Sequence, residues 1–337
     1  MRVLIDVTPL QRAPSGTAVY LERLLPALEQ AGATVLTTQR PPRERGRGGP
    51  RSYVNAAVEA AWIAEELPRR ARRARADVLH HPLPAHARAA PCPQAITVHD
   101  LAFERLPACF DPRFRAVARR RHRAAAWAAA AVVTPSRATA ADVEALWGVP
   151  GDRVIVAAHG PGQAPAPGRR GIAHFLYVGD DEPRKNLPRL LEAYARYREA
   201  TGEGALPLVL AGRARVAAAP GVRVDPAPDL PALLARAAAL VVPSLHEGFG
   251  LTALEAMHAG APVLAARIPA LVEVCGAAAR YADPRDPASI ATGLLELATV
   301  PPLREELRRR GLARAEAFSW DRAAAAHLTA YSLALAR

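Results

Sequence analysis

The chain has 337 residues, more than the roughly 150 of a typical single domain, which predicts two domains. Half of the residues are hydrophobic and 23% are charged, which excludes a disordered or fibrous protein. The formal net charge is +12, and most of this excess falls in residues 1–165, where 23 arginines face 14 acidic residues. Such basicity leaves anionic partners open, namely nucleic acid or an anionic membrane.

No apolar run approaches the roughly 20 residues that a membrane-spanning helix requires, and a strand-like run already begins at residue 2. The three cysteines, Cys92, Cys109 and Cys275, are widely spaced and form no CxxC pair. The sequence therefore encodes neither a disulfide framework nor a zinc site. These features predict a cytoplasmic protein in a reducing compartment.

Short apolar runs alternate with helical stretches in both halves of the chain. The predicted strands of the first half are 3–7, 34–38, 77–80, 95–99, 131–134 and 154–157. Those of the second half are 174–178, 207–211, 222–224, 239–242 and 262–265. This alternation predicts parallel sheets with helices on both faces, so the fold class is α/β with two tandem, doubly wound, Rossmann-like domains.

Two segments rich in Pro and Gly interrupt the pattern. Residues 160–168 cannot continue a helix or a central strand, and they predict a linker between domains at 1–165 and 166–315. Residues 40–50 carry Pro, Gly and Arg with almost no apolar side chains, and they predict a mobile loop. Neither GxGxxG after a first strand nor GxxxxGK[ST] occurs, which disfavours a standard NAD enzyme or P-loop NTPase.

The turn after the first predicted strand reads PSGTAVY, with Gly16 at the start of a helix. A glycine there lets a ligand approach the free N–H groups, and the helix dipole favours an anion at the same point. Gly16 is therefore a candidate phosphate-binding residue. A tight turn without a ligand explains the pattern equally well.

Of the 44 basic residues, Lys185 is the single lysine. Arg184 and Lys185 follow a predicted buried strand, at the end where open α/β sheets bind ligands. An ammonium is a compact point charge and a guanidinium is a planar fork, so one lysine among 43 arginines indicates a position that needs the point charge. We predict that the pair binds a phosphate, with a solvated charge pair as the structural alternative.

A second informative stretch covers residues 241–263. A predicted strand delivers Glu247 at its carboxyl end, a glycine-flanked loop exposes backbone amides, and a helix begins near Leu251. Glu255 follows Glu247 by eight positions, so the two carboxylates can hold two hydroxyl-rich parts of one ligand. Taken alone, Glu247 could be a helix-dipole partner and Glu255 a surface residue.

These motifs resemble the retaining glycosyltransferases of family 4, which have the GT-B fold, and the resemblance runs over nearly the whole chain. The stretches that carry it are PSGTAVY (14–20), TVHDL (97–101), VVTPSRATAADVEALWGVP (132–150), LYVGDDEPRKNL (176–187), EGFGL to LEAM (247–257) and FSWDRAAAAHL (318–328). Thr252 stands where the family usually has proline. The resemblance implies two domains facing across a cleft, with the helix of residues 316–337 crossing back to the first domain.

The resemblance also implies a role for each candidate residue. Arg184, Lys185 and the amides of the Gly16 loop would hold the donor diphosphate, and Glu255 would bind the ribose. His99 and Glu247 would act at the transferred sugar. The sugar would also contact the backbone of Gly248, Phe249, Gly250 and Leu251. Loops near 212–215 and 224–226 would contact the base.

The implied activity is transfer of a hexose, with retention, from a nucleotide-diphosphate sugar of the GDP-mannose or UDP-glucose type. The acceptor would be a hydroxyl of an unidentified glycan, glycolipid or small molecule. We expect no cofactor and no metal, because Arg184 and Lys185 would take the place of a divalent ion. A GT-B phosphorylase or epimerase, or a basic nucleic-acid-binding protein, remain alternatives.

Arginines crowd one predicted helix of the first half, at positions 113, 115, 119, 120, 121 and 123, and a second cluster at 69–75. Such a helix can dock on anionic lipid, which would place the protein peripherally at the inner face of the membrane. We expect no nucleic-acid partner, because aromatic residues are only 5% of the chain and no recognition motif occurs. A solvated arginine-rich surface is the plain alternative.

Overall fold

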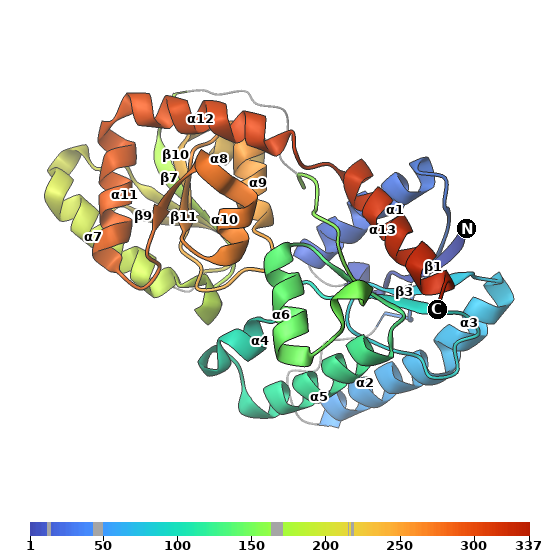
Figure 1. The fold of residues 1–337 in the computed structure, drawn as a ribbon. Coiled ribbons are helices and arrows are strands. Elements are labelled where there is room, and N and C mark those ends of the chain that lie inside the picture. The colour runs from blue at the N-terminus through green and yellow to red at the C-terminus, as the bar shows by residue number, and fades with distance from the viewer. Residues whose placement is uncertain (12–14, 43–49, 163–170, 215, 217–218) are drawn as a thin grey trace. The chain divides into compact units, whose positions relative to one another are not determined.

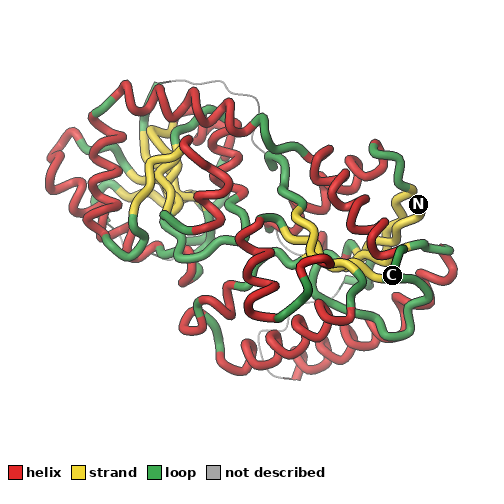
Figure 2. Tube along the Cα trace, viewed as in Figure 1, coloured by secondary structure: helices red, strands yellow, loops and turns green. Residues whose placement is uncertain are grey.

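The computed structural model describes residues 1–11, 15–42, 50–162, 171–214, 216 and 219–337. The chain forms two compact units (Figure 1). Unit 1 comprises Met1–Glu104, Phe110–His159 and Trp320–Arg337, and unit 2 comprises Arg105–Cys109 and Gly160–Ser319. Within the described residues, each unit contains one parallel six-stranded sheet surrounded by helices (Figure 2). The predicted α/β class with two Rossmann-like domains is confirmed.

The sheet of unit 1 has the strand order β2-β1-β3-β4-β5-β6. Its strands are β1 (Arg2–Asp6), β2 (Thr34–Thr38), β3 (Val78–His81), β4 (Gln94–Thr97), β5 (Ala131–Thr134) and β6 (Val154–Val156). Its helices are α1 (Gly16–Gln30), α2 (Pro50–Ala61), α3 (Leu67–Ala74), α4 (Ala102–Arg105), α5 (Pro112–Ala128), α6 (Arg137–Trp147) and α13 (Trp320–Leu335). Short helical turns occupy Thr8–Gln11, Trp62–Glu66 and Gly151–Arg153.

Alternating side chains of each strand in unit 1 supply the two faces of its sheet. On β1, Val3 and Ile5 pack with α1 and α13, whereas Leu4 packs with Trp62 and α3 on the opposite face. Farther along the sheet, α5 and α6 cover Ile96 and neighbouring apolar side chains. The inner strands β3, β4 and β5 are buried on both sides, whereas the edge strands β2 and β6 are partly exposed.

Helix α13 returns the end of the chain to unit 1, as the fold prediction implied. Its buried positions repeat every three to four residues and are mostly alanines, so the helix lies close against α1 and the sheet. Its buried polar residues join a hydrogen-bonded chain that runs from Tyr331 through His80, Thr97 and Tyr20 to His327. These hydrogen bonds tie four elements, α1, β3, β4 and α13, together within one core.

The contacts of His327 fix which groups donate and which accept at its end of this hydrogen-bonded chain. Nδ1 of His327 lies 2.7 Å from the carbonyl oxygen of Ala323, so Nδ1 carries the proton and Nε2 accepts from the hydroxyl of Tyr20 at 2.8 Å. Burial lowers the pKa of His327 to about 4 and holds the pKa of His80 well below its usual value. Both imidazoles are therefore neutral parts of the core at physiological pH.

The sheet of unit 2 has the order β12-β11-β10-β7-β8-β9. Its strands are β7 (His174–Val178), β8 (Leu208–Ala211), β9 (Val222–Asp225), β10 (Ala237–Val242), β11 (Val263–Ala266) and β12 (Ala279–Ala282). Its helices are α7 (Leu187–Thr201), α8 (Leu230–Arg236), α9 (Leu251–His258), α10 (Pro269–Cys275), α11 (Pro287–Thr299) and α12 (Pro301–Ala315). Short helical turns occupy Pro107–Cys109, Pro183–Lys185, Gly202–Gly204 and Gly276–Ala278.

One strand of unit 2 was missing from the sequence prediction. Strand β12 has the sequence ARYA and lies at the edge of the sheet. Among the described residues it pairs with β11 alone. Two alanines and an arginine carry little of the β-branched signal that marked the other strands. The predicted linker at 160–168 and loop at 40–50 lie largely outside the described residues, because 163–170 and 43–49 are not described.

Candidate functional site

The chain order of the strands in unit 2 marks one crevice of its sheet. From β7 the chain adds β8 and β9 on one side, and it then crosses to add β10 on the other side. The carboxyl ends of β7 and β10 therefore flank a topological switch point, which is where open α/β sheets bind ligands. The loop after β7 carries Arg184 and Lys185, and the loop after β10 carries Glu247.

Backbone geometry shapes the cationic turn after β7. Gly179 has φ of 150°, and the carbonyl oxygen of Gly179 lies only 2.4 Å from where a Cβ on Gly212 would be. Only glycine at 212 lets the loops after β7 and β8 approach this closely. A short helical turn, Pro183–Lys185, follows and is closed by the N–H of Lys185, which donates to the carbonyl oxygen of Glu182 at 2.8 Å.

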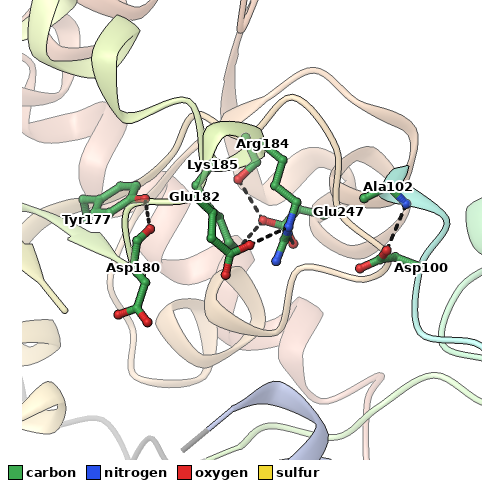
Figure 3. Close-up of polar contacts among 9 residues, drawn as sticks. Asp100, Ala102, Tyr177, Asp180, Glu182, Arg184, Lys185 and Glu247 are labelled. Atoms are coloured by element: carbon green, nitrogen blue, oxygen red, sulfur yellow. Dashed lines mark hydrogen bonds and ion pairs between the residues drawn. The ribbon is translucent and has the colours of Figure 1, made fainter. Parts of the chain in front are cut away.

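The turn presents its two cations to Glu247 (Figure 3). Nζ of Lys185 donates to Oε1 of Glu247 at 2.6 Å, and Nη1 of Arg184 lies 3.6 Å from Oε2. Nε of Arg184 also pairs with Glu182 at 2.9 Å. The hydroxyl of Ser244 donates to Oε1 of Glu247 at 2.7 Å. The structure therefore brings together three of the residues that the sequence analysis singled out.

Burial and charge act in opposite directions on Glu247. Burial raises the pKa of its carboxyl, but Lys185 and Arg184 outweigh it, with further hydrogen bonds from Lys185 and Ser244, and the net pKa is lowered. Glu247 is therefore anionic at physiological pH. A buried carboxylate between two cations is well placed to exchange partners with an anionic, hydroxyl-rich ligand.

The glycine loop after Glu247 leads directly into α9, which begins at Leu251 as predicted. Gly250 has φ of 100°, and a Cβ there would lie 2.5 Å from Cδ2 of Leu271, so this position requires glycine. The N–H groups of Ala253 and Leu254 donate to the carbonyl oxygen of Gly250, so the N–H groups that α9 can direct at a ligand are those of Leu251 and Thr252. Phe249 differs, because its ring is buried against Phe318 at 5.8 Å between centroids and can offer a sugar only its backbone.

Glu255 lies within α9 and is only 5% exposed. This rules out the alternative that it is an ordinary helix-surface residue. Gly248 is buried, whereas Leu251 is partly exposed at the helix start. Of the loop at 212–215, which was predicted to contact the base, residues 212–214 are among the described residues and Arg215 is not.

Two candidates, Gly16 and His99, lie in unit 1. Gly16 is the first residue of α1, and the side chain of Ser15 caps the helix by accepting from the N–H of Ala18 at 3.3 Å. A Cβ on Gly16 would meet nothing within 4 Å, so its backbone imposes no local need for glycine. Gly16 remains a candidate only because it is the first residue of a helix, where the leading N–H groups point out of the helix.

His99 follows the end of β4 by two residues. Its Nε2 lies 3.0 Å from the carbonyl oxygen of Pro82, and the ring of Tyr20 contacts it edge-on at 5.0 Å between centroids. Burial lowers the pKa of His99, partly offset by Asp100 and the Pro82 carbonyl. The neutral ring therefore donates from Nε2 and leaves Nδ1 as an acceptor for a hydroxyl group.

A hollow of about 470 Å³ lies elsewhere in unit 2, at the amino-terminal edge of the sheet. Its lining includes Tyr194, Arg198, Glu203 and Pro220. The convergent charged groups lie instead at the carboxyl edge, around Lys185 and Glu247. Because polar groups with shifted pKa values are the better indicator of chemistry, we place the site at the carboxyl edge.

Two site residues were missed by the sequence analysis. Ser244 holds Glu247, and Asn186 joins the cationic turn to neighbouring loops. Asn186 follows Lys185 directly and Ser244 precedes Glu247 by three positions, but a serine or asparagine in a loop is too common to be marked by type alone. Among the described residues, no three His, Cys, Asp or Glu side chains gather as a metal site would require. The same residues include no helix with the length and apolarity to cross a membrane.

Two family models match the chain and together span most of it. Residues 173–299 match the model described as "Glycosyl transferases group 1", and residues 14–161 match "Glycosyltransferase Family 4". The first match contains the cations, both carboxylates and the glycine loop, and the second contains Gly16 and His99.

Curated relatives match parts of the chain. The O-antigen chain mannosyltransferase B of Escherichia coli is 37% identical over 175 residues, which cover 48% of this chain and 46% of that protein. The MMP alpha-(1->4)-mannosyltransferase of Mycolicibacterium hassiacum is 42% identical over 113 residues, covering 32% of this chain and 28% of that protein. The matches thus span less than half the length of these relatives.

Solved structures match the whole fold at low sequence identity. Sucrose-phosphate synthase from Thermosynechococcus elongatus superposes with a TM-score of 0.75 at 20% identity, covering 98% of both chains. This likeness concerns the fold alone. With both domains matched by family models and the architecture shared with a glycosyltransferase-fold structure, the chain belongs to the group 1, family 4 glycosyltransferases of GT-B fold.

Proposed function

We propose that the protein transfers a hexose, mannose in preference to glucose, from a nucleotide-diphosphate sugar to an acceptor hydroxyl, with retention. The observation that carries this proposal is the pairing of Arg184 and Lys185 with the buried Glu247 at the switch point of unit 2. The names of the two mannosyltransferase relatives favour mannose, and of the two donors considered above we therefore propose GDP-mannose. A glycan or glycolipid acceptor is in keeping with the O-antigen relative.

Each proposed role uses a group described above. As the bond to the sugar breaks, negative charge grows on the leaving diphosphate, and Arg184 and Lys185 stabilise it most in the transition state. The ion pair from Lys185 to Glu247 would open on donor binding and free Glu247 for the sugar hydroxyls. Glu255 would hold the ribose, and the glycine-loop amides would hold the sugar. In unit 1, His99 would accept from a sugar hydroxyl, and the Gly16 amides would aid the diphosphate.

The donor is tested by thermal unfolding of the protein with GDP-mannose, UDP-glucose, their diphosphates and an oligonucleotide. A ligand at about 100 times its dissociation constant should stabilise by roughly 2.7 kcal/mol, and we expect GDP-mannose to do so. Product analysis by NMR should then show the transferred sugar with its anomeric configuration retained. Stabilisation by the oligonucleotide alone, or release of sugar 1-phosphate with inorganic phosphate, would contradict the proposal.

We further propose that transfer needs no metal, because the charges of Arg184 and Lys185 can neutralise the diphosphate directly. Initial rates should be equal before and after extensive treatment with EDTA. Magnesium or manganese added back should leave the rate unchanged. Activity that is lost on chelation and restored by either ion would show that a divalent cation shares the diphosphate site.

A second proposal is that α5 docks on an anionic membrane surface. Arg113, Arg120 and Arg121 are exposed on this helix. Phe114 and Val117 lie beside them, 51% and 55% exposed. Basic and apolar side chains together on one exposed face are typical of interfacial helices, each cation contributing about 1 kcal/mol near anionic lipid. The other arginines of α5 are less available, since Arg119 pairs with Glu104 at 3.2 Å.

Sedimentation with phosphatidylglycerol vesicles tests this docking. The triple change Arg113→Ser, Arg120→Ser and Arg121→Ser should reduce binding, and added salt should weaken binding of the unchanged protein. The matched control replaces Arg308, Arg309 and Arg310 of α12 with serine, which removes the same charge from a helix where each pairs with glutamate. Absence of binding at low salt, or equal losses in both triple variants, would disprove docking through α5.

A further inference from the structure

Asn186 sits between the cationic turn and α7 in a backbone conformation that few residues adopt. Its φ and ψ are 61° and 30°, in the left-handed region. Among the described residues other than glycine, only Arg75 shares a positive φ. Asparagine tolerates this region better than most side chains. The left-handed residue turns the chain from Lys185 directly into the first turn of α7.

The side chain of Asn186 is 2% exposed, and its whole amide is used. Nδ2 donates to the carbonyl oxygens of Pro243 at 2.9 Å and Pro284 at 2.6 Å. Oδ1 accepts from Nη1 of Arg189 at 2.9 Å. Pro243 begins the loop after β10 and Pro284 lies in the loop after β12, so one amide joins three loops at the carboxyl edge of the sheet.

These bonds run beside the ion pair but do not depend on it. The loop that starts at Pro243 carries Ser244 and Glu247, and the N–H of its Leu245 donates to the carbonyl oxygen of Arg184 at 2.8 Å. A donor diphosphate would compete with Glu247 for Lys185, so the ion pair cannot hold the two loops together during binding. The amide of Asn186 and the N–H of Leu245 can, because both are uncharged and both already bond to carbonyl oxygens of the protein.

We propose that Asn186 is a positioning residue, which keeps the Arg184–Lys185 turn and the Glu247 loop at a fixed separation while the ion pair between them opens for the donor. The role of Asn186 in donor binding rests on the proposed function. Its structural core, the fixed separation of two loops, can be measured without any ligand. Asn186 itself touches no donor in this proposal and acts only through the groups that do.

Asn186→Gly is the sharpest variant, because glycine keeps the left-handed backbone and removes all three side-chain bonds. The matched control is Tyr194→Phe, in the middle of α7. It removes a hydroxyl whose single proton lies within reach of two backbone carbonyl oxygens, those of Leu206 and Gly221 at 3.1 and 3.0 Å, at the opposite edge of the sheet. Both variants lose side-chain hydrogen bonds to backbone carbonyl oxygens within unit 2, so Tyr194→Phe shows what such a loss does away from the site.

Amide hydrogen exchange gives the ligand-free readout. In Asn186→Gly the N–H of Leu245 should exchange about tenfold faster or more, because lost hydrogen bonds let the two loops separate. In Tyr194→Phe it should exchange as in the unchanged protein. Equal exchange of Leu245 in all three proteins would overturn the inference, whether or not the protein binds nucleotides.

Steady-state kinetics give the second readout, well below the unfolding temperature of every variant. Asn186→Gly should raise KM for the donor and lower kcat, reducing kcat/KM by about tenfold or more, while Tyr194→Phe stays close to the unchanged enzyme. Similar kcat and KM values in both variants would overturn the positioning role. Failure of the unchanged protein to use any nucleotide sugar would instead disprove the proposed function.

A milder variant keeps the test decisive if Asn186→Gly does not fold. Arg189→Leu retains Asn186 and removes only the exposed guanidinium that holds its Oδ1. We expect the N–H of Leu245 to exchange faster and kcat/KM to fall in this variant too, but by smaller factors than in Asn186→Gly. An unchanged Leu245 exchange rate in this variant would count against the inference.

Discussion

Replacing Lys185 with arginine should lower kcat/KM for the donor by about tenfold, although the charge is kept, and Lys185→Ala should lower it by about a hundredfold or more. The Lys185 side chain is only 16% exposed, and its Nζ donates to Oε1 of Glu247 at 2.6 Å. Tyr177, Ser244 and Thr252 line the same small space. A planar, longer guanidinium cannot occupy that space and direct a single point charge at a diphosphate. Initial rates across donor concentrations measure the loss.

Charge-conserving changes elsewhere provide the control for Lys185→Arg. Arg196→Lys on α7 alters an exposed pair with Glu192 and should leave kcat/KM unchanged. Because Lys185 is the single lysine, an amine-reactive label that is followed by mass spectrometry reports on this side chain directly. Nucleoside diphosphate should slow its labelling. Full activity in Lys185→Arg, or labelling that the diphosphate does not affect, would remove Lys185 from the proposed site.

The regular core of both units could be predicted because parallel strands that are buried on both faces leave continuous apolar runs. All eleven predicted strands have a counterpart within the described residues, and their ends differ by at most two positions. Strand β12 could not be found, since an edge strand of sequence ARYA needs little apolar character to pair with β11. The helix start at Leu251 was predictable from Gly250, whose backbone only glycine adopts without strain.

The residues of the site could be predicted from the sequence, but the contacts between them could be predicted only in part. Charge type and position after a strand marked Arg184, Lys185 and Glu247, because switch-point loops carry ligands in this kind of sheet. The direct ion pair from Lys185 to Glu247 was not foreseen, since residues 62 positions apart show no common pattern in sequence. Phe249 was assigned to the sugar through its backbone alone, and the packing of its side chain against Phe318 in the core was not foreseen. Such contacts depend on tertiary packing that local sequence does not encode.

The two carboxylates should respond to mutation in different ways. Glu255, 5% exposed within α9, is proposed to hold the ribose, so Glu255→Gln should weaken the nucleoside diphosphate and the full donor to the same degree. Glu247 is proposed to hold the sugar, which the diphosphate lacks. Because Glu247 also pairs with Lys185 at 2.6 Å, Glu247→Gln should leave diphosphate affinity intact or strengthen it, as the ammonium no longer faces a carboxylate.

The loss in Glu247→Gln should appear in turnover instead. Contacts to the sugar tighten as positive charge grows on its ring, and losing one such contact typically costs roughly 3 kcal/mol, or about a hundredfold in kcat. Calorimetry with the diphosphate and steady-state kinetics with the donor measure both variants. Ser244→Ala is the matched control, since it removes a hydroxyl that holds Oε1 of Glu247 at 2.7 Å but keeps the carboxylate, and it should lower kcat by a smaller factor. Equal losses of diphosphate affinity in Glu247→Gln and Glu255→Gln would show that the two roles are wrongly assigned, because only a shared contact with the diphosphate or ribose produces that result.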